Sequence, residues 1–174
     1  MKRIVSALLL AAVMGAATAA PDHIEAAVPQ ARLAGTGLFT YFGMKIYTAE
    51  LTVGARGYAP AAPFALDLRY ERNLKGKKIA EASADQMEKI GAGTPAQRQA
   101  WLQKMTAIFP DVAEGHHLTG INLPDTGVRF FHNGVAIGAI DDPAFARAFF
   151  GIWLDPASTA PALRKALLSQ AAPR

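Results

Sequence analysis

The chain has 174 residues, with 18 basic and 14 acidic side chains and no cysteine. The absence of cysteine excludes disulfide bonds and thiol catalysis, so packing alone must stabilise the fold. The basic residues are spread along the chain rather than clustered, which argues against a nucleic-acid-binding protein. This length is typical of one domain with a single sizeable core.

The segment 1–19 has the organisation of a secretory signal peptide. A basic start, Met1-Lys2-Arg3, precedes an apolar stretch at 4–16 and the small-x-small site Ala17-Thr18-Ala19. The apolar stretch is shorter than the roughly 20 residues that span a bilayer as a helix, so we expect cleavage after Ala19 and no stable membrane insertion afterwards. Loss of the two basic residues lowers the formal net charge from +4 to +2. The sequence therefore predicts an exported protein, in the periplasm of a Gram-negative bacterium, with an uncleaved membrane tether as the alternative.

After a lead-in at 20–32, the sequence predicts three strands. Residues 33–53 alternate apolar and polar side chains on either side of Gly43, which predicts two antiparallel strands with a turn or bulge there. Residues 54–63 are rich in glycine, alanine and proline and predict a loop. The alternation resumes at 64–72, where a third strand is expected.

The hydrophobic period then changes to that of two helices. Residues 77–90 place apolar side chains on one helical face, and two glycines at 91 and 93 end that helix. Thr94 predicts the start of a second helix because it can cap the chain, with Gln97 in the capping-box position. We expect this helix to run to Phe109.

Three further strands are predicted at 116–123, 128–132 and 135–140, joined by short turns. Asn133-Gly134 is the strongest hairpin signal, because both central residues of a type I′ turn need positive φ. Strands and helices that do not alternate regularly favour an α+β fold, with a mainly antiparallel sheet and helices packed on one face. We expect a single domain at 33–169.

Two helices complete the predicted domain. Asp142 before Pro143 predicts a helix N-cap rather than one of a pair of catalytic carboxylates. The apolar run 149–154 is expected to pack in the core, with a partner-binding patch or a pocket wall as the alternatives. A last helix is predicted from 161 to 169, and the tail 170–174 is expected to fray.

A series of short motifs runs through the chain: Gly35-x-Gly37, Lys45-Ile46-Tyr47-x-Ala49-x-Leu51, Leu68-x-Tyr70, Phe109-Pro110-Asp111-Val112-x-x-Gly115, Phe131-x-Asn133-Gly134-x-x-x-Gly138-x-Ile140, Phe149-Phe150-Gly151-Ile152-Trp153-Leu154 and Leu163-Arg164-x-x-Leu167-Leu168. In this order and spacing they resemble the bacterial chalcone isomerase-like family. The resemblance covers nearly the whole mature chain. It implies the open-faced β-sandwich fold of chalcone isomerase, with a ligand cleft between the sheet and the helices.

The resemblance also implies the parts that catalysis would need. In the plant isomerases, which cyclise a chalcone, an arginine positions the phenolate nucleophile while a tyrosine and a threonine polarise the ketone. Aligned through the motifs, the arginine position falls on Phe39, the threonine position on Phe42 and the tyrosine position on Ile79. A late polar position that lines the plant pocket falls on Gly151. These replacements remove the donors that stabilise a developing enolate and leave an apolar cleft.

The favoured hypothesis is therefore an exported, non-catalytic protein that binds a small apolar or amphipathic ligand, such as a fatty acid, with no cofactor and no metal. The ligand-binding residues predicted for it are Phe39, Phe42, Arg69, Tyr70, Ile79 and Gly151. Arg69 could meet a carboxylate, although strand alternation places it opposite Tyr70. His116 and His117 point to opposite faces of a strand and are expected at the surface rather than at a metal.

Two other hypotheses remain open. The first is an intramolecular lyase or isomerase in which Arg32 and either Tyr41 or Tyr47 replace the missing residues. It requires a guanidinium and a hydroxyl to converge on one point in the cleft. The second is a structural or partner-interaction protein of the envelope, whose cleft is filled by side chains and whose run 149–154 is exposed. The sequence identifies no protein partner.

Overall fold

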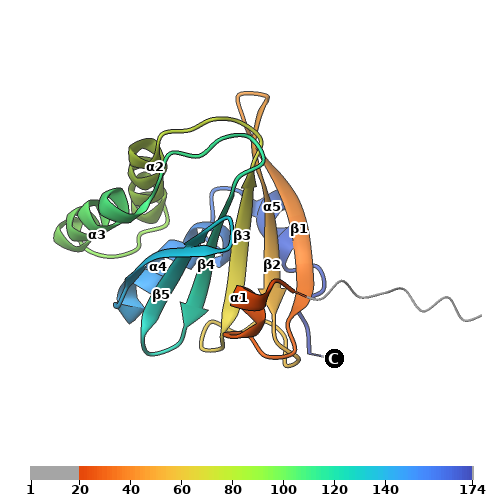
Figure 1. Ribbon diagram of the computed structural model, residues 1–174. Helices are drawn as coiled ribbons and strands as arrows, with labels where there is room; N and C mark the ends of the chain where they lie inside the picture. The colour runs from red at the N-terminus through yellow and green to blue at the C-terminus, as the bar shows by residue number, and fades with distance from the viewer. Residues whose placement is uncertain (1–19, 174) are drawn as a thin grey trace, which may run out of the picture.

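The computed structural model describes residues 20–173, so the predicted signal peptide at 1–19 lies outside the described residues. Six strands form one antiparallel sheet in chain order: β1 (Arg32–Tyr41), β2 (Met44–Val53), β3 (Phe64–Tyr70), β4 (His117–Leu123), β5 (Gly127–His132) and β6 (Val135–Ile140). Each strand pairs with the strand before it, so the sheet is open, with β1 and β6 at its edges (Figure 1).

Most helices cover one face of the sheet, which we call the inner face. Helices α2 (Gly76–Lys89) and α3 (Pro95–Ile108) connect β3 to β4, and α4 (Pro143–Leu154) and α5 (Pro161–Leu167) follow β6. Helix α3 begins with the predicted capping box of Thr94 and Gln97. Figure 1 shows α4 and α5 behind the sheet and the α2–α3 pair to one side. The predicted α+β fold is confirmed.

The opposite, outer face also carries packed residues, which the prediction of one-sided packing missed. The lead-in contains a short helix, α1 (Asp22–Glu25), which lies in front of the sheet in Figure 1. Ile24 and Val28 of this segment pack against Ala65 and Ile121 of the sheet. Their burial removes apolar surface from water and anchors the segment to the outer face. Within residues 20–173, no helix is long and apolar enough to cross a membrane.

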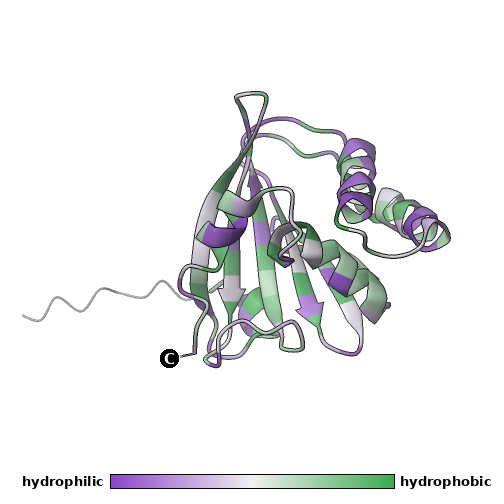
Figure 2. Cartoon of the chain, turned by 180° about the vertical axis from the view of Figure 1, so that it is seen from behind, coloured by the Kyte–Doolittle hydropathy of each residue, from purple (hydrophilic) through white to green (hydrophobic). Residues whose placement is uncertain are grey.

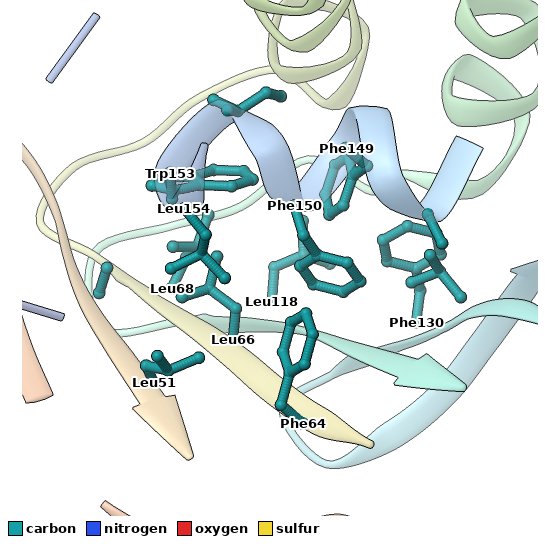
Figure 3. Packing of buried hydrophobic residues seen from close by; sticks show 14 of the residues in the cluster. Leu51, Phe64, Leu66, Leu68, Leu118, Phe130, Phe149, Phe150, Trp153 and Leu154 are labelled. Atoms are coloured by element: carbon teal, nitrogen blue, oxygen red, sulfur yellow. The ribbon is translucent and has the colours of Figure 1, made fainter. Parts of the chain in front are cut away.

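Helix α4 supplies most of the aromatic core. It is largely hydrophobic (Figure 2), and its residues Phe149, Phe150 and Trp153 are buried. Figure 3 shows these three side chains directed at residues of the sheet, and Phe150 packs edge-on against Phe64 of β3 with ring centroids 4.8 Å apart. The run 149–154 therefore lies in the core, as predicted, because a helix that is apolar nearly all round must be buried.

One carboxylate fixes the start of α4. Asp142 Oδ1 accepts hydrogen bonds from the backbone N–H groups of Ala144 (2.8 Å) and Phe145 (3.1 Å), which confirms the predicted N-cap. Its Oδ2 accepts a hydrogen bond from Nε1 of Trp101 in α3 at 2.8 Å. Partial burial raises the pKa of Asp142, but these hydrogen bonds and nearby Lys104 outweigh it and hold the pKa below its usual range. The same side chain therefore caps α4 and joins it to α3.

Two hairpin turns share one backbone geometry but differ in sequence. In the β5–β6 turn, Asn133 and Gly134 have φ angles of 50° and 79°, as predicted for Asn-Gly. In the β1–β2 turn, Phe42 and Gly43 have φ angles of 46° and 74°. Phenylalanine is uncommon at positive φ because its Cβ crowds the backbone there.

Three register shifts interrupt the sheet. In the β1–β2 pairing, the partners skip Ala34 of β1 and Ile46 of β2. In the β5–β6 pairing, they skip Ile137 of β6. An extra residue of this kind forms a β-bulge, which breaks the strict alternation of side chains between the two faces.

Helix α5 lies directly on β1, where the sequence has two glycines. A Cβ at Gly35 would overlap the backbone carbonyl oxygens of Ala166 and Leu167, and a Cβ at Gly37 would meet the side chain of Leu163. The motif Gly35-x-Gly37 therefore allows a close approach of helix to strand that no larger residue would permit.

The tail was expected to fray, and this is wrong for residues 170–172. The backbone N–H of Gln170 donates to Ala34 O at 2.8 Å, and the Arg32 guanidinium donates to the carbonyl oxygens of Gln170 and Ala172. The backbone N–H of Tyr58 donates to the carbonyl oxygen of Ala171 at 2.8 Å. These residues stay in place because their backbone groups find partners in the domain.

We predict that Asp142→Ala destabilises the protein by about 2–4 kcal/mol, because it removes the cap and leaves a buried indole N–H without an acceptor. Urea unfolding followed by circular dichroism would measure this. Asp141→Ala is the matched control: its carboxylate pairs with the partly exposed Arg129 at the surface, so the cost should stay below about 1 kcal/mol. Equal costs for the two variants would contradict the linking role of Asp142.

Candidate ligand-binding cavity

A cavity of about 380 Å³ lies between the inner face of the sheet and helices α2 and α4. Its volume is within the range usual for small-molecule sites. Strands β1 to β4 all contribute side chains to it, and 12 of its 21 lining residues are apolar. The cleft that the sequence predicted between sheet and helices is therefore open rather than filled by side chains, and it suits a mainly apolar ligand.

Three aromatic side chains on neighbouring strands form the sheet side of the cavity. Phe39 of β1 pairs in register with Tyr47 of β2, which pairs with Tyr70 of β3. The rings of Phe39 and Tyr47 stack with centroids 5.0 Å apart, and Tyr47 meets Tyr70 edge-on at 5.9 Å. Ile46 also lines the cavity. Adjacent residues on one strand can share the cavity here because Ile46 is a bulge residue.

The Tyr47 hydroxyl is oriented by α4. Nε1 of Trp153 donates a hydrogen bond to the Tyr47 oxygen at 3.0 Å. The indole has no acceptor capacity, so the phenolic proton of Tyr47 must point elsewhere and can be donated to a molecule in the cavity. Burial raises the pKa of Tyr47 well above its usual value and outweighs the opposing effect of the Trp153 hydrogen bond. Tyr47 is therefore a neutral hydrogen-bond donor.

Tyr70 presents a second hydroxyl to the cavity. Its side chain is almost fully buried, and its hydroxyl makes no hydrogen bond to any residue in the range 20–173. Burial is the main cause that raises the pKa of Tyr70, and neighbouring Tyr47 and Asp67 add to it. Among the described residues, the fully buried side-chain atoms without a hydrogen-bond partner belong to His23 and Arg32 and not to Tyr70. The Tyr70 hydroxyl is therefore accessible from the cavity, where it can donate its proton to a bound acceptor.

The charged groups that line the cavity all come from α2. Lys78, Asp85 and Lys89 are exposed residues at its α2 side. On the same helix the Ser83 hydroxyl donates to the carbonyl of Ile79 at 2.8 Å, so its proton is already used. The sheet and α4 contribute no charged group to the cavity wall. The interior can therefore hold an oxygen acceptor by neutral donors, while ionic contacts are confined to the α2 side.

Five of the residues singled out from the sequence line this cavity. They are Phe39, Tyr41, Tyr47, Tyr70 and Ile79. They come from three adjacent strands and from α2. The structure thus brings together positions that are well separated in the chain.

Phe42 and Gly151, which were also predicted to bind ligand, lie elsewhere. Phe42 occupies the β1–β2 turn and is 86% exposed. Gly151 lies on the side of α4 that faces α2, where a Cβ would meet Ile90. Phe42 is therefore outside the strands that form the cavity, and Gly151 lies in α4 on the side away from it.

The two arginines predicted for the site are also outside it. Arg69 lies on the outer face, where it forms an ion pair with Glu71 at 2.8 Å. Arg32 holds the carbonyl oxygens of the C-terminal tail and lies at the opposite end of β1 from the β1–β2 turn. The hypothesis of a lyase that uses Arg32 with Tyr41 or Tyr47 is therefore wrong in its arginine, because the Arg32 guanidinium is held by the tail and does not line the cavity.

His116 and His117 contact different partners, as expected of neighbouring residues that point to opposite faces of a strand. His116 lies 3.0 Å from His132 between ring nitrogens, and His117 Nδ1 lies 2.6 Å from a carboxylate oxygen of Asp67. Among the described residues, no group of three histidine, cysteine, aspartate or glutamate side chains could hold a metal ion.

Sequence reasoning missed Lys89 and did not place Trp153 among the site residues. Core packing was the favoured role of Trp153 and a pocket wall an alternative, and the structure shows both. A buried indole N–H needs an acceptor, and a search for one would have pointed to a tyrosine such as Tyr47. Nothing in the sequence marked Lys89 as a site residue, because lysine is common in the last turn of a helix, where it interacts favourably with the helix dipole.

Comparisons with known proteins agree with this architecture. Residues 12–169 match the sequence profile of the chalcone isomerase-like family. An uncharacterized protein of Haemophilus influenzae is 32% identical over 137 residues, which cover 78% of this chain and 67% of that protein. Among solved structures, a fatty-acid binding protein of Arabidopsis thaliana superposes with a TM-score of 0.66 over 83% of this chain and 91% of that one. At 12% identity the last likeness shows the fold alone. On the extent of the profile match, this chain belongs to the chalcone isomerase-like family.

Proposed function

We propose that this protein is exported and binds an elongated, mainly apolar molecule that carries an oxygen acceptor, such as a fatty acid, without chemical conversion. The observation that carries the proposal is the pair of Tyr47 and Tyr70 hydroxyls, which are neutral donors in the part of the cavity wall, formed by the sheet and α4, that contains no charged group. The apolar walls favour a hydrocarbon chain, and the two hydroxyls favour a carbonyl or carboxyl oxygen at one point along it.

The distribution of charge supports a binding role rather than the lyase. A developing enolate needs donors that are matched to its charge, and in plant relatives the resemblance assigns one of them to a guanidinium. The cavity wall formed by the sheet and α4 contains no cation. An ionised group in its interior would be poorly stabilised, whereas a neutral acceptor would be well accommodated.

The proposal is supported by one solved structure of the same fold, that of the fatty-acid binding protein of Arabidopsis thaliana. The signal-peptide pattern at 1–19 supports export to the periplasm. An exported carrier would meet apolar molecules in an aqueous compartment, where they need protection from water.

The first test is native mass spectrometry, followed by organic extraction, of the protein purified from its exporting host without detergent. We expect a co-purifying lipid-like molecule. Methyl palmitate should then bind more tightly than hexadecane, because neutral donors recognise the oxygen, and palmitic acid should bind no more tightly than its ester, because an ionised carboxylate is poorly stabilised there. An empty protein that binds none of the three would overturn the proposal, and a strong preference for the acid would move recognition to Lys78 or Lys89.

Tyr70→Phe is the sharpest variant for the cavity. It should weaken binding of methyl palmitate about tenfold, the effect of losing one hydrogen bond. The free energy of unfolding should stay the same or rise, because the hydroxyl has no protein partner to lose. Tyr58→Phe, which changes a tyrosine that does not line the cavity, is the control and should leave the affinity unchanged. Fluorescence displacement would measure the affinities. If Tyr70→Phe bound methyl palmitate as tightly as the wild type does, the Tyr70 hydroxyl would not be a contact of the ligand.

The raised tyrosine pKa values predict an alkaline effect on stability. Above about pH 10 an unfolded tyrosine releases its proton, whereas folded Tyr70 keeps it, so the unfolded state is favoured as the pH rises. Between pH 9 and 11 this lowers the free energy of unfolding by about 1.4 kcal/mol in total for each such tyrosine, because the unfolded side chain is half ionised near pH 10. Urea unfolding at pH 9 and pH 11 should show a loss that is smaller by about this amount in Tyr70→Phe than in the wild type. Identical losses would show that Tyr70 titrates normally.

A further inference from the structure

The β1–β2 turn exposes an unusual group of apolar side chains. We call residues 41–45 the hairpin tip. Phe42 is 86% exposed, and Tyr41 and Met44 beside it are 57% and 46% exposed. The rings of Tyr41 and Phe42 contact each other edge-on with centroids 4.5 Å apart. Figure 1 shows this hairpin protruding beyond the end of the sheet.

The conformation of Phe42 makes this exposure notable. The chain uses Asn133-Gly134 for the β5–β6 turn, the residue pair that suits positive φ at both positions. The hairpin tip has the same geometry with Phe42 in place of asparagine, which strains the backbone and also leaves an aromatic ring in water. Neither property stabilises the isolated fold, so a binding partner for the ring would explain both.

Two basic residues lie at the tip. Lys45 is exposed on the tip itself, and the segment 36–49 contains no acidic residue. Arg72 lies beside the tip, with its Nη1 2.9 Å from the sulfur of Met44. The other basic residues of the segment 68–79 have acidic partners: Arg69 pairs with Glu71, Lys75 with Asp111, and Lys77 and Lys78 with Glu81. An apolar tip flanked by the cations of Lys45 and Arg72 complements an anionic lipid surface.

The tip is continuous with the cavity. Tyr41, which belongs to the tip, lines the cavity together with Ile46 just after it. Lys78, which also lines the cavity, is exposed. A surface that received the tip would therefore lie next to the opening of the cavity.

We propose that the hairpin tip docks this protein on an anionic lipid bilayer. Phe42, with Tyr41 and Met44, enters the interface between head groups and acyl chains, a depth that aromatic side chains favour. Lys45 and Arg72 contact the head groups, where each basic residue contributes to attraction by an anionic surface. The docked protein then holds its cavity at the bilayer surface, where apolar molecules can enter it. This inference goes beyond the proposed function, because docking does not require the cavity to be occupied.

Vesicle flotation tests the proposal with the chain beginning at Ala20, since the preceding apolar stretch would bind vesicles by itself. The domain described at residues 20–173 is complete in this form, and circular dichroism verifies its folding. The neutral vesicles contain phosphatidylcholine alone, and the anionic vesicles contain phosphatidylcholine with a minor fraction of phosphatidylglycerol. We expect binding to the anionic vesicles that weakens as salt is raised.

Phe42→Asn is the decisive variant, because asparagine tolerates positive φ and removes only the ring. It should reduce partition into anionic vesicles at least tenfold and unfold at the same or a higher urea concentration. Val135→Asn, which changes a side chain that is 67% exposed on the opposite edge strand, is the matched control and should bind as the wild type does. Lys45→Glu should weaken binding to anionic vesicles and leave binding to neutral ones unchanged.

A fluorescent variant gives a direct readout of depth. Both native tryptophans are buried, so F42W adds an exposed emitter whose spectrum should shift to shorter wavelength when anionic vesicles are added. The proposal is overturned if the wild type binds neither kind of vesicle, if Phe42→Asn binds like the wild type, or if Val135→Asn loses as much. Phe42→Asn should keep wild-type affinity for methyl palmitate in solution, and Tyr70→Phe should keep vesicle binding, so the failure of docking and the failure of ligand binding are distinguishable.

Discussion

The fold depends on the packing of α4 against the inner face of the sheet. Phe149, Phe150 and Trp153 fill the layer between them, and Asp142 fixes where the helix begins. The same packing also shapes the cavity, because Trp153 has a polar edge as well as an apolar body: its rings fill the core while its N–H fixes the Tyr47 oxygen. The core and the candidate site are therefore not separate parts of the molecule. A change that shifted α4 would alter the orientation of the donor as well as the stability.

Local chemistry in the sequence was sufficient to predict most of the fold. The caps at Thr94 and Asp142 and the Asn133-Gly134 turn depend on hydrogen bonds or backbone angles within a few residues, so they can be read directly. Alternating patterns likewise predicted the strands. The packed lead-in and the anchored tail were missed, since both depend on partners that are distant in sequence. Burial of Ile24 against Ile121, for example, joins the start of the domain to its fourth strand.

The candidate site was predicted in part, and its errors have physical origins. Phe39, Tyr47, Tyr70 and Ile79 line the cavity, and Phe39 and Ile79 were reached through the family motifs rather than through the hydrophobic pattern. Phe42 failed because it lies in the β1–β2 turn, where its side chain projects into solvent. The arginines failed for a different reason: a long side chain goes where acceptors are available, and for Arg32 these are backbone carbonyls of the tail. Residue type alone does not predict such a destination.

The bulges also affect the edges of the open sheet. An edge strand with free N–H and C=O groups can pair with the edge of another molecule and begin an aggregate. Here Ala34 interrupts β1 and Ile137 interrupts β6, so each edge contains an irregular position. A regular incoming strand would lose register at these positions and could form only a short ladder. The bulges at Ala34 and Ile137 thus protect a cysteine-free domain, which has no covalent crosslink to stabilise it, from association through its own sheet.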